Sequence, residues 1–258
     1  MLSTYFSYNL ITRDLDRSLD RVEARPLVQR ESEYYLENIT SVKSIDAFLS
    51  DDRLFRYAMK AYGLEDMDYA KAFMEKVLTE GIDDEESFAN KLSDSRYKEF
   101  AEVFNFARHG ETATLFERAQ QGTVDRYVRQ TLEEDAGNQN EAVRLALYFE
   151  RKAPEVGSVY GLLADSALAR VTYTMLGLPD SFAALDIDKQ AEFIKERIDI
   201  EDFGDPEALA EMVRRFTAMW DVQNPDTTAV NNVSILFSEP AEYGISTNLL
   251  LTLQQMKS

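Results

Sequence analysis

The chain has 258 residues, of which 45% are hydrophobic and 29% charged, as in an ordinary soluble globular protein. Its 28 basic and 47 acidic residues give a net charge of −19, which disfavours binding to nucleic-acid backbones and anionic lipid surfaces. The absence of cysteine excludes disulfides, thiol nucleophiles and cysteine-ligated zinc or iron–sulfur sites.

The first predicted element is one helix over about residues 3–25, which Pro26 ends. Its apolar residues recur every three or four positions and share one face, which consists of Tyr8, Ile11, Leu15, Leu19 and Val22. This N-terminal stripe is expected either to pack on the body of the protein or to contact a partner in a coiled-coil-like manner.

Further helices are expected along the rest of the chain, near residues 31–38, 52–62, 66–80, 84–93, 95–108, 111–135, 140–153, 157–176, 188–198 and 206–220. Asp83 with Glu86 predicts a capping box at one helix start. The run 136–138 predicts a break between two helices, with Asn138 as the cap of the second. Asp205 followed by Pro and Glu predicts a strong helix start.

Two stretches resemble each other, residues 51–106 and 165–220. Each opens with an amphipathic helix that a Gly-Leu pair stops, and the two glycines, Gly63 and Gly177, are 177 − 63 = 114 residues apart. Glycine suits the left-handed conformation just past a helix end, and the leucine can fold back onto the last turn. The stretches also end alike, in Phe100–Phe104 and Phe216–Trp220. The pattern predicts an internal duplication, unless it reflects only the amphipathicity that unrelated helices share.

After Trp220 the composition becomes that of a linker, rich in Asn, Asp and Thr. The short apolar run Val233 to Phe237 is a candidate strand. Helical spacing then returns in a C-terminal stripe formed by Ile245, Leu249, Leu253 and Met256. We expect an N-terminal helical arm (1–40), a helical body (41–222) and a linker with a C-terminal helical segment (223–258). The expected fold class is all-α, a multi-helix bundle with amphipathic terminal helices.

Residues that would carry chemistry are scarce. The single histidine, His109, excludes a two-histidine metal site and is expected to cap a helix end or lie on the surface. Ser95 and Lys98 match the Ser-x-x-Lys pattern of serine acylases without its partner motifs. The run from Asp186 lacks the glycine and glutamate of a calcium loop. The aromatic residues with core spacing are Tyr97, Phe100, Phe104 and Phe106. We therefore predict no catalytic, metal-binding or cofactor-binding residue and no cofactor.

The stretch from Asp51 to Asp66, DDRLFRYAMKAYGLED, resembles the DUF1217 family of bacterial proteins, as do Ala191–Ile194 and Glu211–Trp220. The resemblance extends from about Ser41 to Asp221. It implies an all-helical fold and gene neighbourhoods shared with flagellar genes of alphaproteobacteria. It implies no catalytic residues.

Two functions stay open. The first is a non-enzymatic protein that binds other proteins through the two terminal stripes, such as a flagellar structural or assembly component. The second is a small-molecule-binding module or enzyme with a pocket between the repeats. An exposed apolar stripe on a terminal helix would favour the first, and a buried polar or charged cluster between the repeats the second. Without a bilayer-length apolar stretch or a secretory signal, we expect the protein in the cytoplasm, or in the flagellum after export by a non-Sec route.

Overall fold

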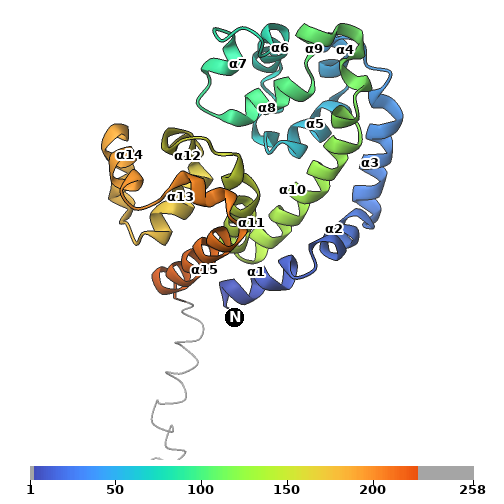
Figure 1. Cartoon of the computed structure of the whole chain (residues 1–258). Helices are drawn as coiled ribbons and strands as arrows, with labels where there is room; N and C mark the ends of the chain where they lie inside the picture. Colours follow the sequence, from blue (N-terminus) through green and yellow to red (C-terminus); the bar gives the residue numbers. More distant parts are fainter. Residues whose placement is uncertain (1–2, 226–258) are drawn as a thin grey trace, which may run out of the picture. The chain divides into compact units, whose positions relative to one another are not determined.

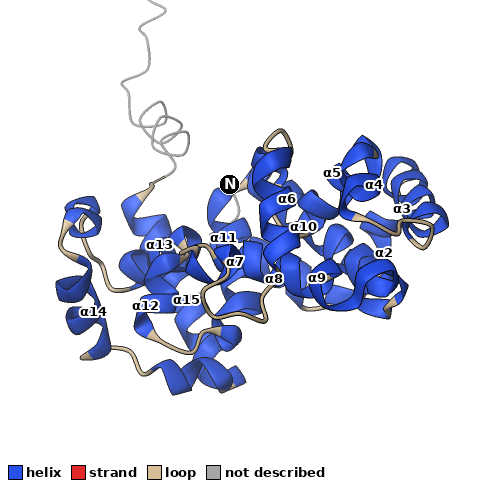
Figure 2. Ribbon diagram, turned by 90° about the horizontal axis from the view of Figure 1, so that it is seen from above, coloured by secondary structure: helices blue, strands red, loops and turns tan. Residues whose placement is uncertain are grey.

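The structure, a computed structural model, describes residues 3–225, which contain helices and no strand (Figure 2). The all-α prediction is confirmed. Within the described residues, 3–223 form one compact unit. The candidate strand at 233–237 and the C-terminal stripe of Ile245, Leu249, Leu253 and Met256 lie outside the described residues.

Short connections join the helices of the described part (Figure 1). In chain order the elements are α1 (Thr4–Thr12), α2 (Leu15–Glu23), α3 (Pro26–Ile39), α4 (Ile45–Ser50), α5 (Asp52–Ala61), η1 (Glu65–Met67), α6 (Lys71–Glu80), α7 (Phe88–Lys91), α8 (Ser95–Val103), α9 (Phe106–His109), η2 (Gly110–Leu115), η3 (Glu117–Ala119), α10 (Gln121–Gln139), α11 (Glu141–Lys152), η4 (Ala153–Glu155), α12 (Val159–Ala164), α13 (Ser166–Met175), η5 (Asp180–Ala184), α14 (Ile187–Lys195), η6 (Ile200–Gly204) and α15 (Pro206–Gln223). Elements labelled η are short 3-10 helices.

An aspartate divides each of two helices that the sequence predicts as continuous. The predicted helix 3–25 consists of α1 and α2, because Asp14 leaves the helical conformation and its carboxylate accepts the backbone N–H of Arg17 at 3.2 Å. The predicted helix 157–176 consists of α12 and α13, because the Asp165 carboxylate accepts two backbone N–H groups of α13 at 2.9 and 3.0 Å. A side chain that caps a new helix start satisfies N–H groups that a continuous helix would bond internally.

The predicted break at 136–138 is wrong. Helix α10 continues to its end at residue 139, and Asn140 rather than Asn138 caps α11 by accepting a backbone N–H at 2.9 Å. Gly137 lies inside α10 where α11 approaches closely, since a Cβ at this position would lie 2.7 Å from Cδ of Arg144. Here glycine permits close contact between two helices rather than ending one.

The acidic run that begins at Asp83 does not form the predicted capping box. Asp83 instead pairs with Arg108, and Asp84 accepts the backbone N–H of Glu86 at 2.9 Å ahead of α7. The negative charges of this acidic run therefore serve ion pairing and turn formation.

The long helix predicted over 111–135 also begins later than expected, as α10, because η2 and η3 occupy its first part.

Two segments of the chain repeat the same cap at an interval of 114 residues. Asp51 begins α5 by accepting two backbone N–H groups, both at 3.0 Å, as Asp165 begins α13. Each aspartate also accepts a tyrosine hydroxyl from the α-helix before the preceding one, from Tyr34 of α3 at 3.0 Å and from Tyr148 of α11 at 2.6 Å. The two tyrosines are 114 residues apart as well. A shared interval in both partners of a tertiary contact indicates duplication more strongly than shared amphipathicity does.

The ends of α5 and α13 also match. Gly63 and Gly177 have φ values of 66° and 69°, in the left-handed region that favours glycine. The N–H of the next residue, Leu64 or Leu178, donates to the carbonyl five residues back at 2.8 and 2.9 Å. The predicted Gly-Leu stop is therefore present in both places, with the hydrogen bond of a Schellman motif.

Helix packing sets the limits of the repeat. Helix α5 packs on α3 and α4, and α4 packs on α6; in the same way α13 packs on α11 and α12, and α12 packs on α14. The last helices differ, since α8 packs mainly on α6 and α7 whereas α15 packs on α11 and α13. We therefore call α3–α6 the first repeat and α11–α14 the second. The repeats begin earlier than predicted, and the packing does not support equivalence of Phe100–Phe104 with Phe216–Trp220.

Each repeat contributes to its own apolar core. The first core contains the predicted aromatic residues, of which Phe100 and Phe104 are fully buried and Tyr97 and Phe106 nearly so. The second core is built from α11, α13, α14 and α15, with Leu162 of α12 and Phe149 of α11 fully buried. Helix α10 packs on α5 and α2 as well as on α11, and it thereby joins the two cores (Figure 1).

Candidate functional site

A buried carboxylate joins α10 to α11. Glu133 on α10 is 1% exposed and accepts hydrogen bonds from Nε of Arg129 at 2.9 Å and from Nε and Nη2 of Arg151, both at 2.8 Å. Arg129 lies one turn earlier on α10, and Arg151 comes from α11. A buried charge is tolerated when it is paired and fully hydrogen-bonded, so this triad holds the two helices in one relative position.

A second ionic group connects this helix pair to α8. The Glu99 carboxylate accepts a hydrogen bond from Nζ of Lys152 on α11 at 2.7 Å and pairs with Arg126 on α10. Burial alone would raise the pKa of Glu99, but the two cations outweigh it and lower that pKa. Because α8 packs with the first repeat and α11 belongs to the second, Glu99 bridges the two.

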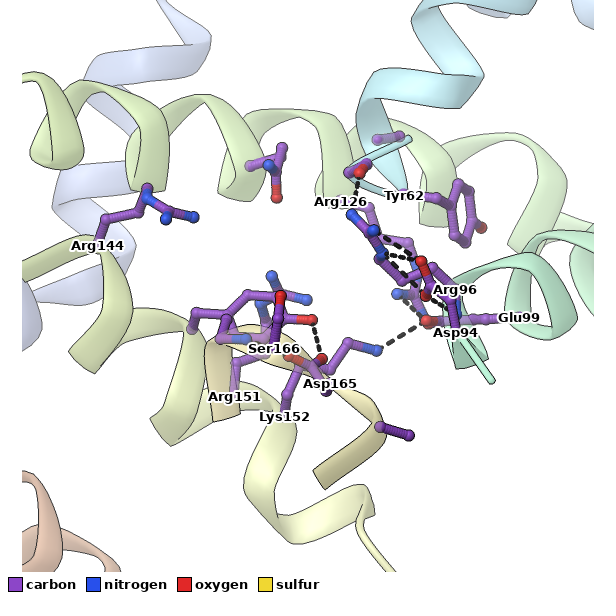
Figure 3. A pocket seen from close by; sticks show the side chains of 16 residues that line it. Tyr62, Asp94, Arg96, Glu99, Arg126, Arg144, Arg151, Lys152, Asp165 and Ser166 are labelled. Carbon is purple, nitrogen blue, oxygen red and sulfur yellow. Dashed lines mark hydrogen bonds and ion pairs between the residues drawn. The ribbon is translucent and has the colours of Figure 1, made fainter. Parts of the chain in front are cut away.

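Arg151 of the triad, together with Glu99, Arg126 and Lys152, lines a cavity of about 190 Å³ between the repeats (Figure 3). We call it the inter-repeat cavity. Its charged lining consists of Arg96, Arg126, Arg144, Arg151, Lys152, Asp94, Glu99 and Asp165. Figure 3 shows Arg144 on one side of the space and Arg96 and Glu99 on the other. Charged residues that lie far apart in sequence therefore meet at one place, with more cations than carboxylates in the wall.

Guanidinium–carboxylate pairs fix the orientation of arginine side chains in the cavity wall. Arg96 donates through Nε and Nη2 to Asp94, at 3.0 and 2.7 Å, and through Nη1 to the carbonyl of Gly63. Arg144 donates through Nε and Nη2 to Glu141, at 3.0 and 2.6 Å. Planar pairs with two parallel hydrogen bonds restrict both partners, so the charged side chains of the wall are preorganised.

A tyrosine–aspartate pair forms the part of the wall between α11 and α13. Burial, followed by the nearby Asp165 carboxylate, raises the pKa of Tyr148 well above its ordinary value. Tyr148 therefore stays a neutral hydrogen-bond donor at physiological pH. The equivalent tyrosine of the first repeat, Tyr34, is half-buried like Tyr148, and a guanidinium lies over each ring, Arg53 at 3.8 Å from Tyr34 and Arg151 at 5.2 Å from Tyr148.

The inter-repeat cavity adjoins a larger hollow of about 550 Å³. The residues that line both spaces are Glu99, Arg126, Lys152 and Asp165. The Ser-x-x-Lys pair of the sequence, Ser95 and Lys98, lies in the wall of this hollow. Among the described residues no hydrogen bond joins these two side chains. Through these shared residues, the cationic wall of the inter-repeat cavity also faces the hollow, which a ligand can enter.

The other sequence candidates lie away from the cavity. His109 ends α9 as expected, with its ring 4.6 Å from that of Phe116 and its Nε2 3.3 Å from Nη2 of Arg118.

Within residues 3–225 no group of three or more histidine, aspartate or glutamate side chains is arranged to hold a metal ion. In the same part of the chain, no helix has both the length and the hydrophobicity that a bilayer span requires.

Replacing Glu99 with Gln is expected to lower the free energy of unfolding at pH 7 by about 1.5–3 kcal/mol, the range for a hydrogen bond to a charged group. Because the folded-state pKa of Glu99 lies below its ordinary value of 4.5, the stabilisation is present above that value and is lost as the pH falls through the folded-state pKa. Urea unfolding between pH 7 and about pH 3 checks this. The difference between wild type and Glu99→Gln should shrink with falling pH, and a constant difference would contradict the assignment.

The predicted N-terminal stripe packs on the body of the same chain. Tyr8 and Val22 are buried, and Ile11, Leu15 and Leu19 are partly buried against the two cores. Helix α1 packs on α11 and α15, and α2 packs on α10. In this structure the body covers Tyr8 and Val22 and part of the surface of Ile11, Leu15 and Leu19. The first two helices thus pack against α10, α11 and α15.

The opposite face of α1 is apolar and exposed. Tyr5, Phe6 and Leu10 are 38%, 49% and 56% exposed, and we call them the α1 surface. Helix α1 contains no charged residue, in a chain in which 29% of residues are charged. The uncharged run from Met1 to Thr12 is the sequence signal for this surface, and apolar periodicity alone does not reveal it.

Comparison with known proteins gives a family and a solved relative. Residues 61–209 match the family model described as "Protein of unknown function (DUF1217)". The crystal structure of protein AGR_C_984 from Agrobacterium tumefaciens is similar to this chain, with 53% sequence identity and a TM-score of 0.82. The match covers 87% of this chain and 98% of that chain. A search of curated proteins gives no match.

Proposed function

The chain belongs to the DUF1217 family, and we propose that it is a non-enzymatic helical protein that binds another protein as a structural or assembly component of the bacterial flagellum. The observation that carries the binding role is the α1 surface, an exposed apolar face on a helix without charges. Its partner is a protein that presents an apolar, uncharged surface of its own.

Burial of the α1 surface would supply binding energy. Fully burying a side chain the size of Leu or Phe contributes about 1.5–3 kcal/mol, and aromatic side chains dominate the energetics of protein interfaces. The charge distribution also favours the α1 surface as the contact site. The chain has a net charge of −19 and therefore repels an acidic partner, but α1 itself brings no charge into the interface.

The surface also has a rigid support. The backbone N–H of Thr4 donates to Asp221 on α15 at 3.1 Å, and the Thr4 hydroxyl donates to the same carboxylate. Asn140, the cap of α11, donates to Thr4 Oγ1 at 2.9 Å. Helix α1 is thus tied to two other helices, and a partner that binds it does not have to order a free segment first.

The flagellar part of the proposal rests on the family resemblance and the gene neighbourhoods that it implies. The protein would act in the cytoplasm during assembly or in the flagellum after export by a non-Sec route.

A genetic test separates the two parts of the proposal. Deleting the gene is expected to abolish swimming in soft agar, and wild-type protein should restore it. The double variant Phe6→Glu, Leu10→Glu should fail to restore swimming, whereas Tyr69→Glu should succeed, because Tyr69 is 78% exposed and lies outside α1. All forms must reach equal abundance and melting temperature. Normal swimming of the deletion strain would exclude the flagellar role, and rescue by the double variant would exclude the α1 surface.

The inter-repeat cavity favours a second candidate function, that of a small-molecule-binding module with its pocket between the repeats. The specific observation is the ring of charged side chains that α8, α10, α11 and α13 bring together there. The two candidates use different parts of the molecule, so each can be tested while the other surface is left intact.

A further inference from the structure

We propose that the inter-repeat cavity binds a small oxyanion, a phosphate or a carboxylate group. The proposal deepens the second candidate function and does not depend on the α1 surface. It starts from the lining of the cavity, where five cationic side chains face three carboxylates although the whole chain carries a charge of −19. Positive charge concentrated in an enclosed polar site attracts anions and holds them more strongly than an exposed site does.

The hydrogen bonds leave donors for a ligand. Arg144 gives Nε and Nη2 to Glu141, and Arg151 gives Nε and Nη2 to Glu133. Neither glutamate belongs to the cavity lining, whereas both arginines do. Within residues 3–225, Nη1 of Arg144 and of Arg151 makes no hydrogen bond. Two guanidinium groups are therefore held by carboxylates outside the cavity and each keeps one amino group for an oxyanion.

The carboxylates of the lining are already engaged. Asp94 accepts hydrogen bonds from Nε, Nη2 and the backbone N–H of Arg96, and Asp165 accepts the Tyr148 hydroxyl and two backbone N–H groups of α13. Ser166, the first residue of α13, also lines the cavity. The positive end of the α13 dipole thus lies at the site and adds to the attraction for an anion.

Comparison of equivalent positions shows that the second repeat differs from the first in the charge of residues that line the cavity. At positions 114 residues apart, the second repeat has Arg151, Lys152 and Ser166 where the first has Glu37, Asn38 and Asp52. Each of these replacements makes the second copy more positive or less negative, and their sum exceeds the one opposite change in the lining, Ala167 where the first repeat has Arg53. The first-repeat positions are solvent-exposed or half-exposed, whereas the second-repeat positions line the cavity. The gain of positive charge therefore lies in the copy whose residues line the inter-repeat cavity.

Thermal unfolding of the full chain in phosphate, in malonate and in sodium chloride of equal ionic strength tests the proposal. A ligand at 100 times its dissociation constant should raise the melting temperature by about 5–10 °C relative to chloride. Comparison of the shift in phosphate with that in malonate distinguishes a phosphate ligand from a carboxylate ligand. Isothermal titration calorimetry with the same salts gives the dissociation constant without reference to stability.

Two variants and their repeat-equivalent controls make the test specific to the cavity. Arg144→Gln removes a donor, and Ser166→Asp places in the second repeat the charge that the first has at Asp52. Both should abolish the saturable shift and the calorimetric signal. Arg30→Gln and Asp52→Ser, at the equivalent exposed positions, should bind as wild type does, and so should the α1 double variant. No saturable effect beyond chloride in the wild type, or equal binding by Arg144→Gln and Ser166→Asp, would overturn the proposal.

Discussion

Replacing Glu133 with Gln is expected to lower the free energy of unfolding by about 3–5 kcal/mol, the loss that follows when one partner of a buried ion pair is removed. Gln keeps the shape of the side chain but leaves Arg129 and Arg151 without a counter-charge between α10 and α11. The destabilisation should therefore come from uncompensated positive charge rather than from a cavity.

Urea unfolding of wild type, Glu133→Gln and a matched control measures this effect. The control is Glu211→Gln, since Glu211 pairs with Arg214 on an exposed face of α15 and such pairs contribute at most about 1 kcal/mol. A shift of the urea midpoint for Glu133→Gln no larger than that of the control would show that the triad does not hold α10 to α11.

Replacing Phe48 with Ala is expected to lower the free energy of unfolding by about 3–5 kcal/mol. Phe48 is fully buried, and its ring lies 4.9 to 6.2 Å from four other phenylalanine rings of the first core. Truncation removes these contacts and leaves a cavity that rigid neighbours cannot fill.

The repeat supplies a companion variant, Leu162→Ala, 114 residues further on. Leu162 is fully buried in the second core, and its truncation should cost about 2–5 kcal/mol. Tyr69→Ala, at a position that is 78% exposed, serves as the surface control. If Phe48→Ala or Leu162→Ala unfolds at the urea midpoint of this control, the packing described for that core is wrong.

The fold class and the matching helix ends of the two repeats were predictable because they depend on local signals. Apolar spacing defines the helices, and Gly63 and Gly177 each precede a leucine at the end of an amphipathic helix. The breaks at Asp14 and Asp165 were not predictable from spacing, because an aspartate on the polar face of a continuous helix fits the same pattern. Only the tertiary structure shows that these side chains cap a new helix.

The inter-repeat cavity could not be predicted from the sequence. Glu99, Arg126 and Lys152 lie on three different helices, and in a chain with 75 charged residues (28 basic and 47 acidic) no single pair stands out. The apolar stripe of α1 and α2 was predictable, but which surface covers it depends on helix packing. The uncharged character of α1 was visible in the sequence, and its exposed face follows only once Tyr8 is known to point toward the body.

Site-specific photo-crosslinking in the native cell tests the central proposal, that the α1 surface binds a partner protein. The photo-crosslinking amino acid p-benzoylphenylalanine would replace Phe6 in one strain and Tyr69 in another. The proposal predicts a discrete crosslinked product with a flagellar protein from position 6 and none from position 69. No product at position 6, or the same products at both positions, would contradict it.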